Sequence, residues 1–358
     1  MGARCDRRAP TFVRVEEEIE RVSRITTGAS LPGTEAVPAE AAATRAPGPD
    51  RDGAHSASVS TRGRASSART RGYLLLAAPA ILFLIVFAAY PIVITIVNSF
   101  RDVTVVGLVT GIMPFVGLDN YVEVLTDPQF AHSTWLTVVF TVFSVACQFL
   151  LGLGMALLLN GRFRGRRALA GLLMVPWVLP IVVIAATFKW MFQSGNGLVN
   201  TVLRAINPDL AVGWLEQATP AMIAIIIANI WFGFPFAMTN LLAALQTIPT
   251  AVTEAATVDG ANGFQRLTRV TLPMIRGPIA ILLTLQLIYT FNVFELILVM
   301  TGGGPAGGTS VVTYYAYQLG FEFFDLGPAS SVTVLMLIFL SLISALYIRL
   351  STRSESRR

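Results

Sequence analysis

Histidine, cysteine and lysine are almost absent from this chain of 358 residues. The chain has two histidines, His55 and His132, two cysteines, Cys5 and Cys147, and one lysine, Lys189. Isolated histidines offer neither a nucleophile with its base nor a set of metal ligands at the usual spacing. Two cysteines, one of them inside a hydrophobic run, cannot hold a disulfide framework. The sequence therefore predicts no metal site and no catalytic residues.

The lack of lysine also bears on nucleotide hydrolysis. A P-loop requires Gly-x4-Gly-Lys-Ser/Thr, because the lysine contacts the phosphates. Lys189 follows Phe188 with no glycine-rich run before it, and the glycine-rich segment 302–309 contains no lysine. We therefore expect a chain that is not an enzyme and does not itself hydrolyse ATP.

Charged residues are scarce as well, and long hydrophobic runs take their place. Asp, Glu, Lys and Arg make up 13 % of the chain, whereas 54 % is hydrophobic and the mean hydropathy is +0.65. A bilayer core of about 30 Å requires roughly 20 apolar residues in a helix. Six stretches qualify: Tyr73–Val97, Trp135–Leu159, Ala168–Phe188, Ala221–Leu245, Pro278–Met300 and Ser331–Ile348. None alternates like a barrel strand, so the sequence predicts an all-α membrane protein with six transmembrane helices.

The arginines indicate how these helices are oriented. They cluster in segments 160–167, 266–276 and 349–358, while the loops between these clusters carry mostly acidic residues. Positively charged loops tend to stay on the cytoplasmic side of a membrane. Both termini and the loop between the fourth and fifth runs are therefore expected in the cytoplasm.

Residues 1–72 differ in composition from the rest of the chain. They hold 12 of the 26 basic residues and are rich in Ala, Pro, Ser, Gly and Thr. Such a segment cannot bury enough apolar surface to fold alone. We expect a disordered cytoplasmic tail over 1–72, a membrane domain over 73–349 and a short cytoplasmic tail over 350–358. The first hydrophobic run is expected to act as an uncleaved signal anchor.

One motif stands between the fourth and fifth hydrophobic runs. Its residues, in order, are Glu254, Ala255, Ala256, Gly260, Val270, Leu272 and Pro273. The spacing predicts a short helix beginning near Pro249, a sharp turn at Gly260 and a second helix stopped by Pro273. A helical hairpin that projects from a membrane protein is suited to a groove on a soluble partner. The alternative is an amphipathic helix that lies on the membrane surface without a partner.

This motif resembles the EAA loop of bacterial ABC importers, and further patterns extend the resemblance over about residues 73–349. The patterns are Gly117-Leu118-Asp119-Asn120-Tyr121, Pro176 with Pro180, Leu245-Gln246-x-Ile248-Pro249, Phe291-Asn292-x-Phe294 and Thr301-x-Gly303-Gly304-Pro305. Together they resemble the permease subunits of carbohydrate importers, of the maltose and glycerol-3-phosphate type. The resemblance implies a type I ABC importer permease fold, with the EAA loop at about residues 246–277.

The resemblance also implies how the chain obtains its energy. On this reading the EAA loop docks into a separate ATPase subunit, which binds the ATP, so that this chain needs no cofactor of its own. The residues that match the docking motif are Glu254, Ala255, Ala256, Asp259, Gly260, Leu272 and Pro273.

A second set of residues is implied for the substrate pathway. In maltose-type permeases the sugar contacts the span that enters the EAA loop and the span that follows it. The matching positions here are Asn229, Gly233, Gln286 and Thr290, with Phe232 beside Gly233 and with Asn292 and Glu295 as further polar candidates nearby. The maltose-type protein has asparagine at the positions of Thr290 and Val293, which implies that the solute is bound differently here. Polar groups inside a bilayer are costly and usually face a cavity or another helix. The alternatives are hydrogen bonds between helices, worth about 0.6 kcal/mol each, and, for Glu295, an anchor at the outer interface.

These features lead to one functional expectation and two alternatives. We expect a multi-pass permease subunit of a bacterial inner membrane that forms half of the pathway for a sugar. Its expected partners are a second permease in a heterodimer, two ATPase subunits, an extracytoplasmic binding protein and membrane lipid, but no nucleic acid. The hydrophobic runs contain no arginine or lysine apart from Lys189 at a helix end, which favours a neutral sugar over a phosphorylated solute. The alternatives are an importer permease for glycerol-3-phosphate or another non-sugar solute and, in another class, a secondary transporter or channel.

Overall fold

The structure is a computed structural model that describes residues 77–355 of the chain. The expected tail at 1–72 and the first residues of the first expected span lie outside this range. Within the range all regular elements are helices, and the only strand-like features are two isolated bridges. The predicted all-α fold class is therefore confirmed.

Four helices in the described range are long and apolar enough to cross a bilayer. They are Ala77–Asn98, which contains η1 (Ile85–Ala89) and α3 (Tyr90–Asn98), α6 (Pro128–Asn160), α10 (Ala218–Gln246) and the Leu326–Ala345 part of α17 (Leu326–Glu355). Two bent pairs add to them: α7 (Arg166–Val178) with α8 (Ile181–Met191), and Gly263–Met274 with α14 (Arg276–Phe291). With each pair counted as one span, this gives six spans, the number that the sequence predicts, although Gly263–Met274 belongs to the segment between the fourth and fifth expected spans.

The expected third span, Ala168–Phe188, is not continuous. It breaks after Val178, and the axes of α7 and α8 differ by 94°. Leu179 takes an extended conformation, with φ −74° and ψ 142°, because a residue that precedes proline is disfavoured in the helical region. Pro180 also lacks the N–H that a continuing helix would need.

The expected fifth span, Pro278–Met300, breaks as well. α14 ends at Phe291, and α15 (Glu295–Met300) begins only after three further residues. Non-helical backbone at membrane depth is tolerated where it is buried in protein or lines a cavity. α15 packs against α8, so the second halves of the two broken spans lie together in the bundle.

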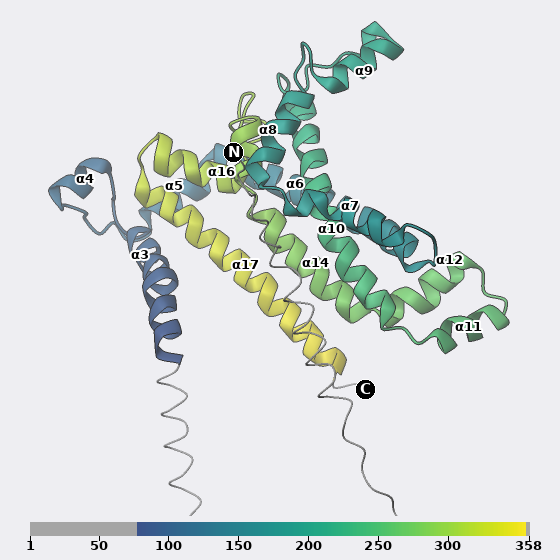
Figure 1. Cartoon of the computed structure of the whole chain (residues 1–358). Helices are drawn as coiled ribbons and strands as arrows, with labels where there is room; N and C mark the ends of the chain where they lie inside the picture. Colours follow the sequence, from purple (N-terminus) through teal and green to yellow (C-terminus); the bar gives the residue numbers. More distant parts are fainter. Residues whose placement is uncertain (1–76, 356–358) are drawn as a thin grey trace, which may run out of the picture. The chain divides into compact units, whose positions relative to one another are not determined.

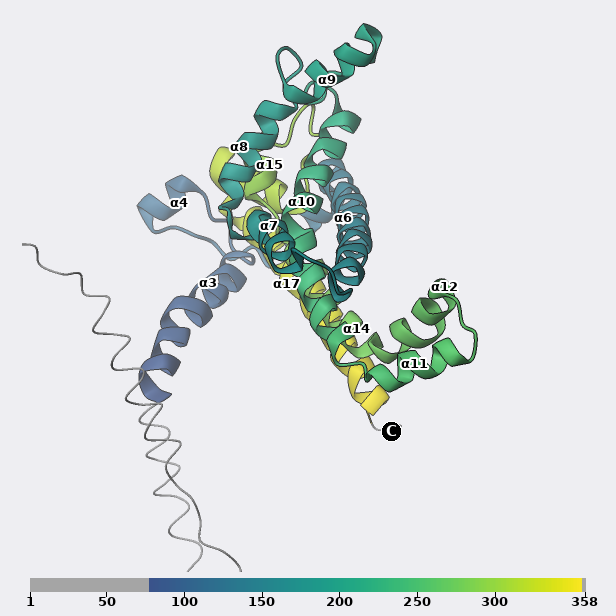
Figure 2. The same cartoon turned by 45° about the vertical axis from the view of Figure 1, so that its right-hand side comes forward.

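The centre of the bundle is the pair α6 and α10, which pack along one another (Figures 1 and 2). One core cluster joins α6, α8, α10 and α15 around Phe140, Ile184, Ile225 and Leu296. A second cluster joins α6, α10 and α14 nearer the other end. In lipid the association of such helices depends on close van der Waals packing rather than on the exclusion of water.

Short helices connect the spans at the end of the bundle away from the hairpin formed by α11 (Thr250–Val258) and α12 (Gly263–Arg266) (Figure 1). They are α4 (Val105–Thr110), α5 (Asp119–Thr126), α9 (Leu198–Ile206), η2 (Pro208–Leu210), α16 (Val312–Tyr317) and η4 (Gln318–Glu322). Tyr314 donates a hydrogen bond to Glu322 over 3.0 Å, and Tyr315 donates one to Asp127 at the start of α6. Burial, together with the bond to Glu322, raises the pKa of Tyr314 to about 12. Burial likewise raises the pKa of Tyr315.

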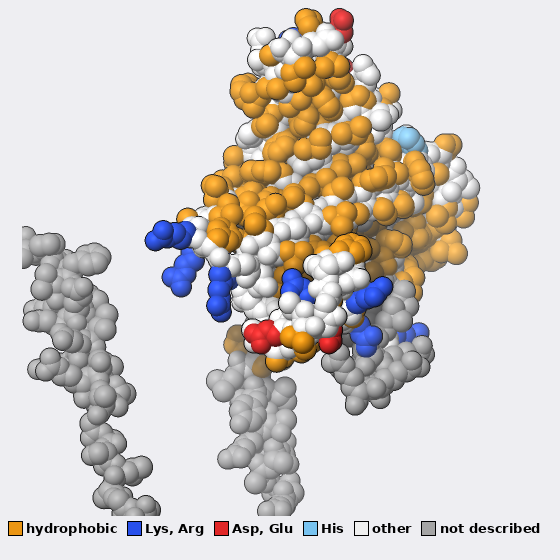
Figure 3. All heavy atoms as spheres, turned by 90° about the vertical axis from the view of Figure 1, so that its right-hand side faces the viewer, with side chains coloured by type: hydrophobic (Ala, Val, Ile, Leu, Met, Phe, Trp, Pro, Cys, Tyr) orange, Lys and Arg blue, Asp and Glu red, His pale blue; other side chains and the backbone are white. Residues whose placement is uncertain are grey.

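The surface of the bundle has the polarity expected of a membrane protein. Hydrophobic side chains cover most of the face shown in Figure 3, and the Lys and Arg side chains gather toward its lower part. The exposed arginines Arg162 and Arg164, which precede α7, and Arg269, which follows α12, are among the basic residues of these cytoplasm-predicted loops. A basic end on an apolar bundle is the distribution that the positive-inside rule describes.

Candidate functional site

The EAA-like segment forms a helical hairpin of two short arms. The first arm is α11 (Thr250–Val258), and Pro249 is its N-cap. Gly260 has φ +77°, in the left-handed region that favours glycine. The second arm begins at α12 (Gly263–Arg266), where Asn262 and Gln265 form a capping box. The predicted helix start and glycine turn are therefore confirmed.

The second arm ends close to Pro273, at Met274, and α14 is bent from it by 77°, so the predicted stop lies one residue further along the chain. The arm runs from α12 through the π-helical turn η3 (Leu267–Thr271) into α13 (Leu272–Met274), with Ile275 as its C-cap. Pro273 lies in the first turn of α13, where the missing N–H costs little. The π turn restarts the hydrogen-bond pattern just before the proline, a feature that the sequence spacing did not reveal.

The hairpin exposes most of its motif residues. Glu254, Ala255, Asp259, Gly260 and Pro273 are exposed, Leu272 is half-buried and Ala256 is buried. Its arms are joined by a hydrogen bond of 2.9 Å from Arg266 to Thr257. In Figures 1 and 2 the hairpin extends from the ends of α10 and α14.

Two large apolar side chains are also exposed on the hairpin. Val258 keeps 88 % of its surface accessible and Phe264 keeps 75 %. Exposed apolar groups beside an exposed carboxylate fit a surface that docks onto another molecule. The same exposure fits the alternative of an interfacial helix, so the geometry alone leaves both open.

All seven residues that the sequence proposes for the substrate pathway line one pocket. Its volume is about 310 Å³, and its lining is Gln148, Trp177, Ile181, Asn229, Phe232, Gly233, Phe236, Gln286, Tyr289, Thr290, Asn292, Val293 and Glu295. We call this the central pocket. It takes residues from both broken spans, since Trp177 and Ile181 flank the first break while Asn292 and Val293 lie in the second.

One wall of the central pocket is aromatic. The ring of Trp177 stacks on Phe232 with centroids 5.3 Å apart and on Phe236 with centroids 5.0 Å apart. The ring of Tyr289 meets Phe236 edge-on at 5.8 Å. Pockets of this kind bind organic solutes through apolar faces, while a few polar groups fix their orientation.

The lining of the central pocket also contains three buried amides. Gln148 donates from Nε2 to the main-chain oxygen of Asn229 over 2.9 Å, and Gln286 donates from Nε2 to Oε1 of Gln148 over 3.1 Å. The exposed fractions of Gln148, Asn229 and Gln286 are 3 %, 1 % and 2 %. The alternative of an interhelical hydrogen bond is therefore realised for Gln286.

The sequence reasoning missed Gln148. The available signal was the one that pointed to Asn229, namely an uncharged polar residue in the middle of an apolar run. Gly233 provides the space for Gln148, because a Cβ atom on that glycine would overlap the Gln148 amide.

Charge is sparse around the central pocket. Among the described residues that line it there is no arginine or lysine, and Glu295 is the one carboxylate. Glu295 and Asn292 are exposed, and Glu295 begins α15. Lys189 lies elsewhere and donates to the main-chain oxygen of Val299 over 2.9 Å. Within residues 77–355 no three His, Cys, Asp or Glu side chains are grouped to hold a metal ion.

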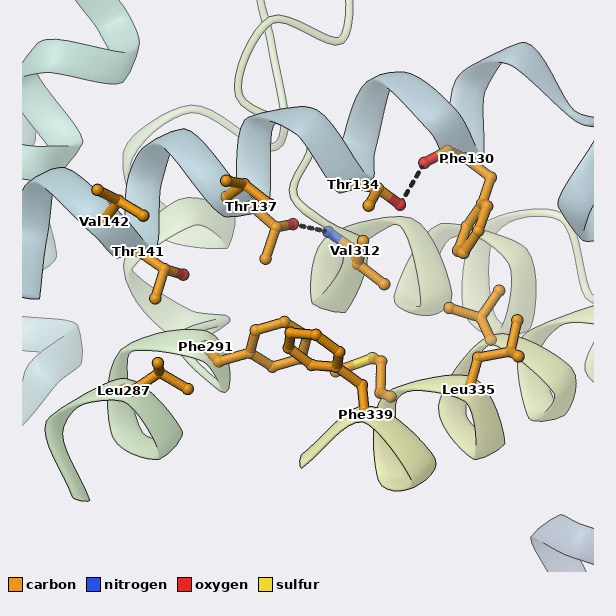
Figure 4. A pocket seen from close by; sticks show the side chains of 13 residues that line it. Phe130, Thr134, Thr137, Thr141, Val142, Leu287, Phe291, Val312, Leu335 and Phe339 are labelled. Carbon is orange, nitrogen blue, oxygen red and sulfur yellow. Dashed lines mark hydrogen bonds between the residues drawn. The ribbon is translucent and has the colours of Figure 1, made fainter. Parts of the chain in front are cut away.

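A second pocket, of about 320 Å³, lies between α6, α14, α16 and α17 (Figure 4). We call it the lateral pocket. Its lining is apolar except for three threonines, Thr134, Thr137 and Thr141. Thr137 accepts a hydrogen bond from the main-chain nitrogen of Val312 over 2.9 Å, whereas the buried hydroxyl of Thr141 has no partner. None of the seven sequence-predicted residues belongs to this pocket.

Comparison with known proteins matches these features to one family. The family model described as binding-protein-dependent transport system inner membrane component covers residues 148–357. The trehalose/maltose transport system permease protein MalF of Thermococcus litoralis is 36 % identical over 279 residues, which are 78 % of this chain and 92 % of that protein. The sulfoquinovosyl glycerol transport system permease protein SmoG of Agrobacterium fabrum is 34 % identical over 278 residues, 77 % of this chain and 89 % of that protein.

A solved structure agrees with these relatives. A chain from the crystal structure of a bacterial ABC transporter involved in the import of the acidic polysaccharide alginate superposes on this chain with a TM-score of 0.70. The two are 26 % identical, and the match covers 81 % of this chain and 99 % of the other.

Proposed function

Because the chain belongs to the family of inner membrane components of binding-protein-dependent transport systems, we propose that it forms half of the translocation pathway of a sugar importer. The central pocket is the part of that pathway which this chain contributes. A second permease subunit contributes the other half. The solute is a sugar delivered by an extracytoplasmic binding protein.

One observation carries this proposal. The residues chosen from the sequence lie on two separate spans, and all seven line a single pocket with an aromatic wall and buried amides. A sugar ring has apolar C–H faces and a rim of hydroxyl groups. The stacked rings of Trp177, Phe232 and Phe236 suit those faces, and the amides suit the hydroxyls. The relatives that transport trehalose, maltose and alginate support a sugar as the solute.

The hairpin at α11–α12 supplies the connection to energy in this proposal. It presents Glu254, Asp259, Val258 and Phe264 to a separate ATPase subunit, two copies of which serve the permease pair. ATP is bound and hydrolysed in those subunits. The hairpin faces the cytoplasm in this proposal, as the sequence predicts for both termini, because positively charged loops favour that side of the membrane.

A phosphorylated solute such as glycerol-3-phosphate is the second candidate. Phosphate recognition in proteins relies on arginine, lysine or helix N-termini, and no cationic side chain lines the central pocket among the described residues. A sister permease could carry such a residue, so the second candidate stays open to experiment. A secondary transporter or channel is disfavoured by the family itself.

Reconstitution tests the proposal. The chain is co-expressed with a tagged candidate ATPase, a candidate sister permease and a candidate binding protein, purified, and placed in proteoliposomes. We expect the four components to co-purify and to take up maltose or trehalose only when ATP and the binding protein are present. ATP-dependent uptake of glycerol-3-phosphate without uptake of any sugar would overturn the sugar assignment. Sugar uptake without an ATPase would overturn the importer assignment.

A further inference from the structure

Gln286, Gln148 and the main-chain oxygen of Asn229 form a chain of two hydrogen bonds, which we call the relay. The donor-to-acceptor direction of this chain is fixed. Its first acceptor is the main-chain oxygen of Asn229, which can only accept hydrogen bonds. Gln148 must therefore turn its nitrogen toward that oxygen, at 2.9 Å, and its own oxygen toward Gln286. Gln286 must in turn donate to Gln148, at 3.1 Å. Neither glutamine can be flipped without placing two oxygens or two nitrogens in contact.

The direction of the relay determines what is left over for a solute. Because Gln286 uses its nitrogen on Gln148, its Oε1 is free and has no partner. The side-chain nitrogen Nδ2 of Asn229 is likewise without a partner. Both atoms are buried, so each carries a desolvation cost until a partner reaches it. Both residues line the central pocket, so a group bound there is the nearest candidate partner.

These two atoms are one acceptor and one donor. A hydroxyl group both donates and accepts, so it can satisfy Gln286 and Asn229 together. A carboxylate or sulfonate could accept from the amide N–H groups, but it has no hydrogen to donate, so it would leave the Gln286 oxygen unsatisfied and place a negative charge beside it. Glu295, the one carboxylate in the lining, also repels a negatively charged solute. The relay therefore favours uncharged solutes over acidic ones.

We propose that Gln148 is a specificity-determining positioning residue, which holds Gln286 with its oxygen free so that the central pocket takes a neutral sugar hydroxyl and rejects an anionic group. This inference rests on the proposed function.

The test measures selectivity rather than activity alone. The complex with its sister permease and ATPase is placed in nanodiscs without the binding protein, so that selection by that protein does not enter. The probes are maltose and its uronic acid derivative, which carries a carboxylate at C6 of one ring. Binding is followed by tryptophan fluorescence, and Trp177→Phe identifies the part of the signal that arises in the pocket.

We expect the wild type to bind maltose at least tenfold more tightly than the acidic probe. Gln148→Leu frees Gln286 to flip and present its nitrogen, so the ratio should fall about tenfold, as for the loss of about 1.4 kcal/mol. Gln286→Leu should lower the ratio of maltose affinity to acidic-probe affinity by the same factor. This ratio in the double variant should be no lower than in either single variant, since the two glutamines act as a unit. Ser144→Ala is the matched control: Ser144 is buried on α6 one turn before Gln148 but does not line the pocket.

Each other outcome has a defined consequence. An unchanged ratio in Gln148→Leu, or additive losses in the double variant, would overturn the role of Gln148 and leave the proposed sugar pathway intact. Tighter binding of the acidic probe than of maltose by the wild type would also overturn the role of Gln148 and leave the proposed sugar pathway intact. If the wild type binds neither probe, this inference fails, whereas the proposed function is decided by ATP-dependent uptake with the binding protein present. Should Gln148→Leu not assemble, Gln148→Met, which keeps the length of the side chain and removes both polar atoms of the amide, provides the same test.

Discussion

The central and lateral pockets have almost equal volumes, about 310 and 320 Å³, and both are lined by α6 and α14. Gln286, Tyr289 and Thr290 of α14 line the central pocket, whereas Leu287 and Phe291 on another face of the same helix line the lateral one. The central pocket therefore has amides and an indole ring in its lining, whereas the lateral pocket is lined by aliphatic and phenylalanine side chains and three threonines. Size alone does not distinguish a solute pathway from a gap between helices; the chemistry of the lining does.

The two pockets also differ in the backbone that surrounds them. The central pocket lies where two expected spans break, at Leu179–Pro180 and at Asn292–Phe294. The lateral pocket lies between continuous helices and the end of α14 (Figure 4). Irregular backbone at membrane depth exposes polar groups and is found where it lines a cavity for a solute. The breaks therefore support the central pocket as the functional one.

The largest effect should come from closing the central pocket. Gly233→Phe places a ring where the Gln148 amide lies, so we expect ATP-dependent uptake to fall by about a hundredfold or more, a loss of roughly 3 kcal/mol. Val142→Phe is the matched change in the lateral pocket, where Val142 is 58 % exposed and can accommodate a larger group. ATP-dependent sugar uptake by the Val142→Phe importer in proteoliposomes should stay within about twofold of wild type. Equal losses in the two variants would contradict the distinction between the pockets.

The next largest effect is expected from a change in the α11–α12 hairpin, whose residues line neither the central nor the lateral pocket. Gly260→Val forces a β-branched residue into a left-handed conformation at φ +77°, at a cost of about 1–2 kcal/mol or more. We expect about tenfold less ATPase subunit to co-purify, while sugar binding to the central pocket persists.

Gly263→Val provides the control for that change. Gly263 begins α12, and a Cβ atom there would meet nothing within 4 Å. The ATPase should co-purify with this variant as with wild type. Wild-type co-purification of the ATPase with Gly260→Val would contradict the docking role of the hairpin. Loss of sugar binding in this variant would contradict the claim that the hairpin and the central pocket act independently.

A moderate effect is expected from removing one polar group of the central pocket. Asn229→Leu deletes the unpartnered Nδ2 donor but leaves the main-chain oxygen that Gln148 uses. Sugar affinity should fall about tenfold, as for one buried hydrogen bond of about 1.4 kcal/mol, with ATPase docking unchanged. Undiminished affinity would indicate that Asn229 only packs between helices.

The smallest effect is the corresponding change in the lateral pocket. Thr141→Val replaces a buried hydroxyl that has no partner by a methyl group of similar size. Transport should not change, and the thermal unfolding temperature in detergent should stay equal or rise slightly, since removal of an unsatisfied polar group gains at most about 1 kcal/mol. Loss of uptake in this variant would assign the lateral pocket a role in transport.

The sequence indicated much of the site because its signals are local. A polar residue within an apolar run, such as Asn229 or Thr290, stands out without any knowledge of its neighbours. The glycine turn at Gly260 follows from spacing alone. These predictions needed only the order of residues along one segment.

The features that the sequence missed depend on contacts between distant segments or on backbone detail. Gln148 meets Asn229 and Gln286 across 81 and 138 residues of chain, and only the register of α6 against α10 and α14 reveals it. The break at Leu179–Pro180 lies inside a continuous hydrophobic run, so hydropathy gives no sign of it. The π turn before Pro273 is equally invisible to composition.

A structure of the assembled importer with its sugar bound tests the central claim most directly. The complex, held with a non-hydrolysable ATP analogue and saturating maltose or trehalose, would be imaged by electron microscopy. We predict density for a sugar ring against Trp177 and Phe232, with a hydroxyl between Asn229 and Gln286. Sugar density in the lateral pocket, or a central pocket filled by side chains while sugar binds elsewhere in this chain, would contradict the account.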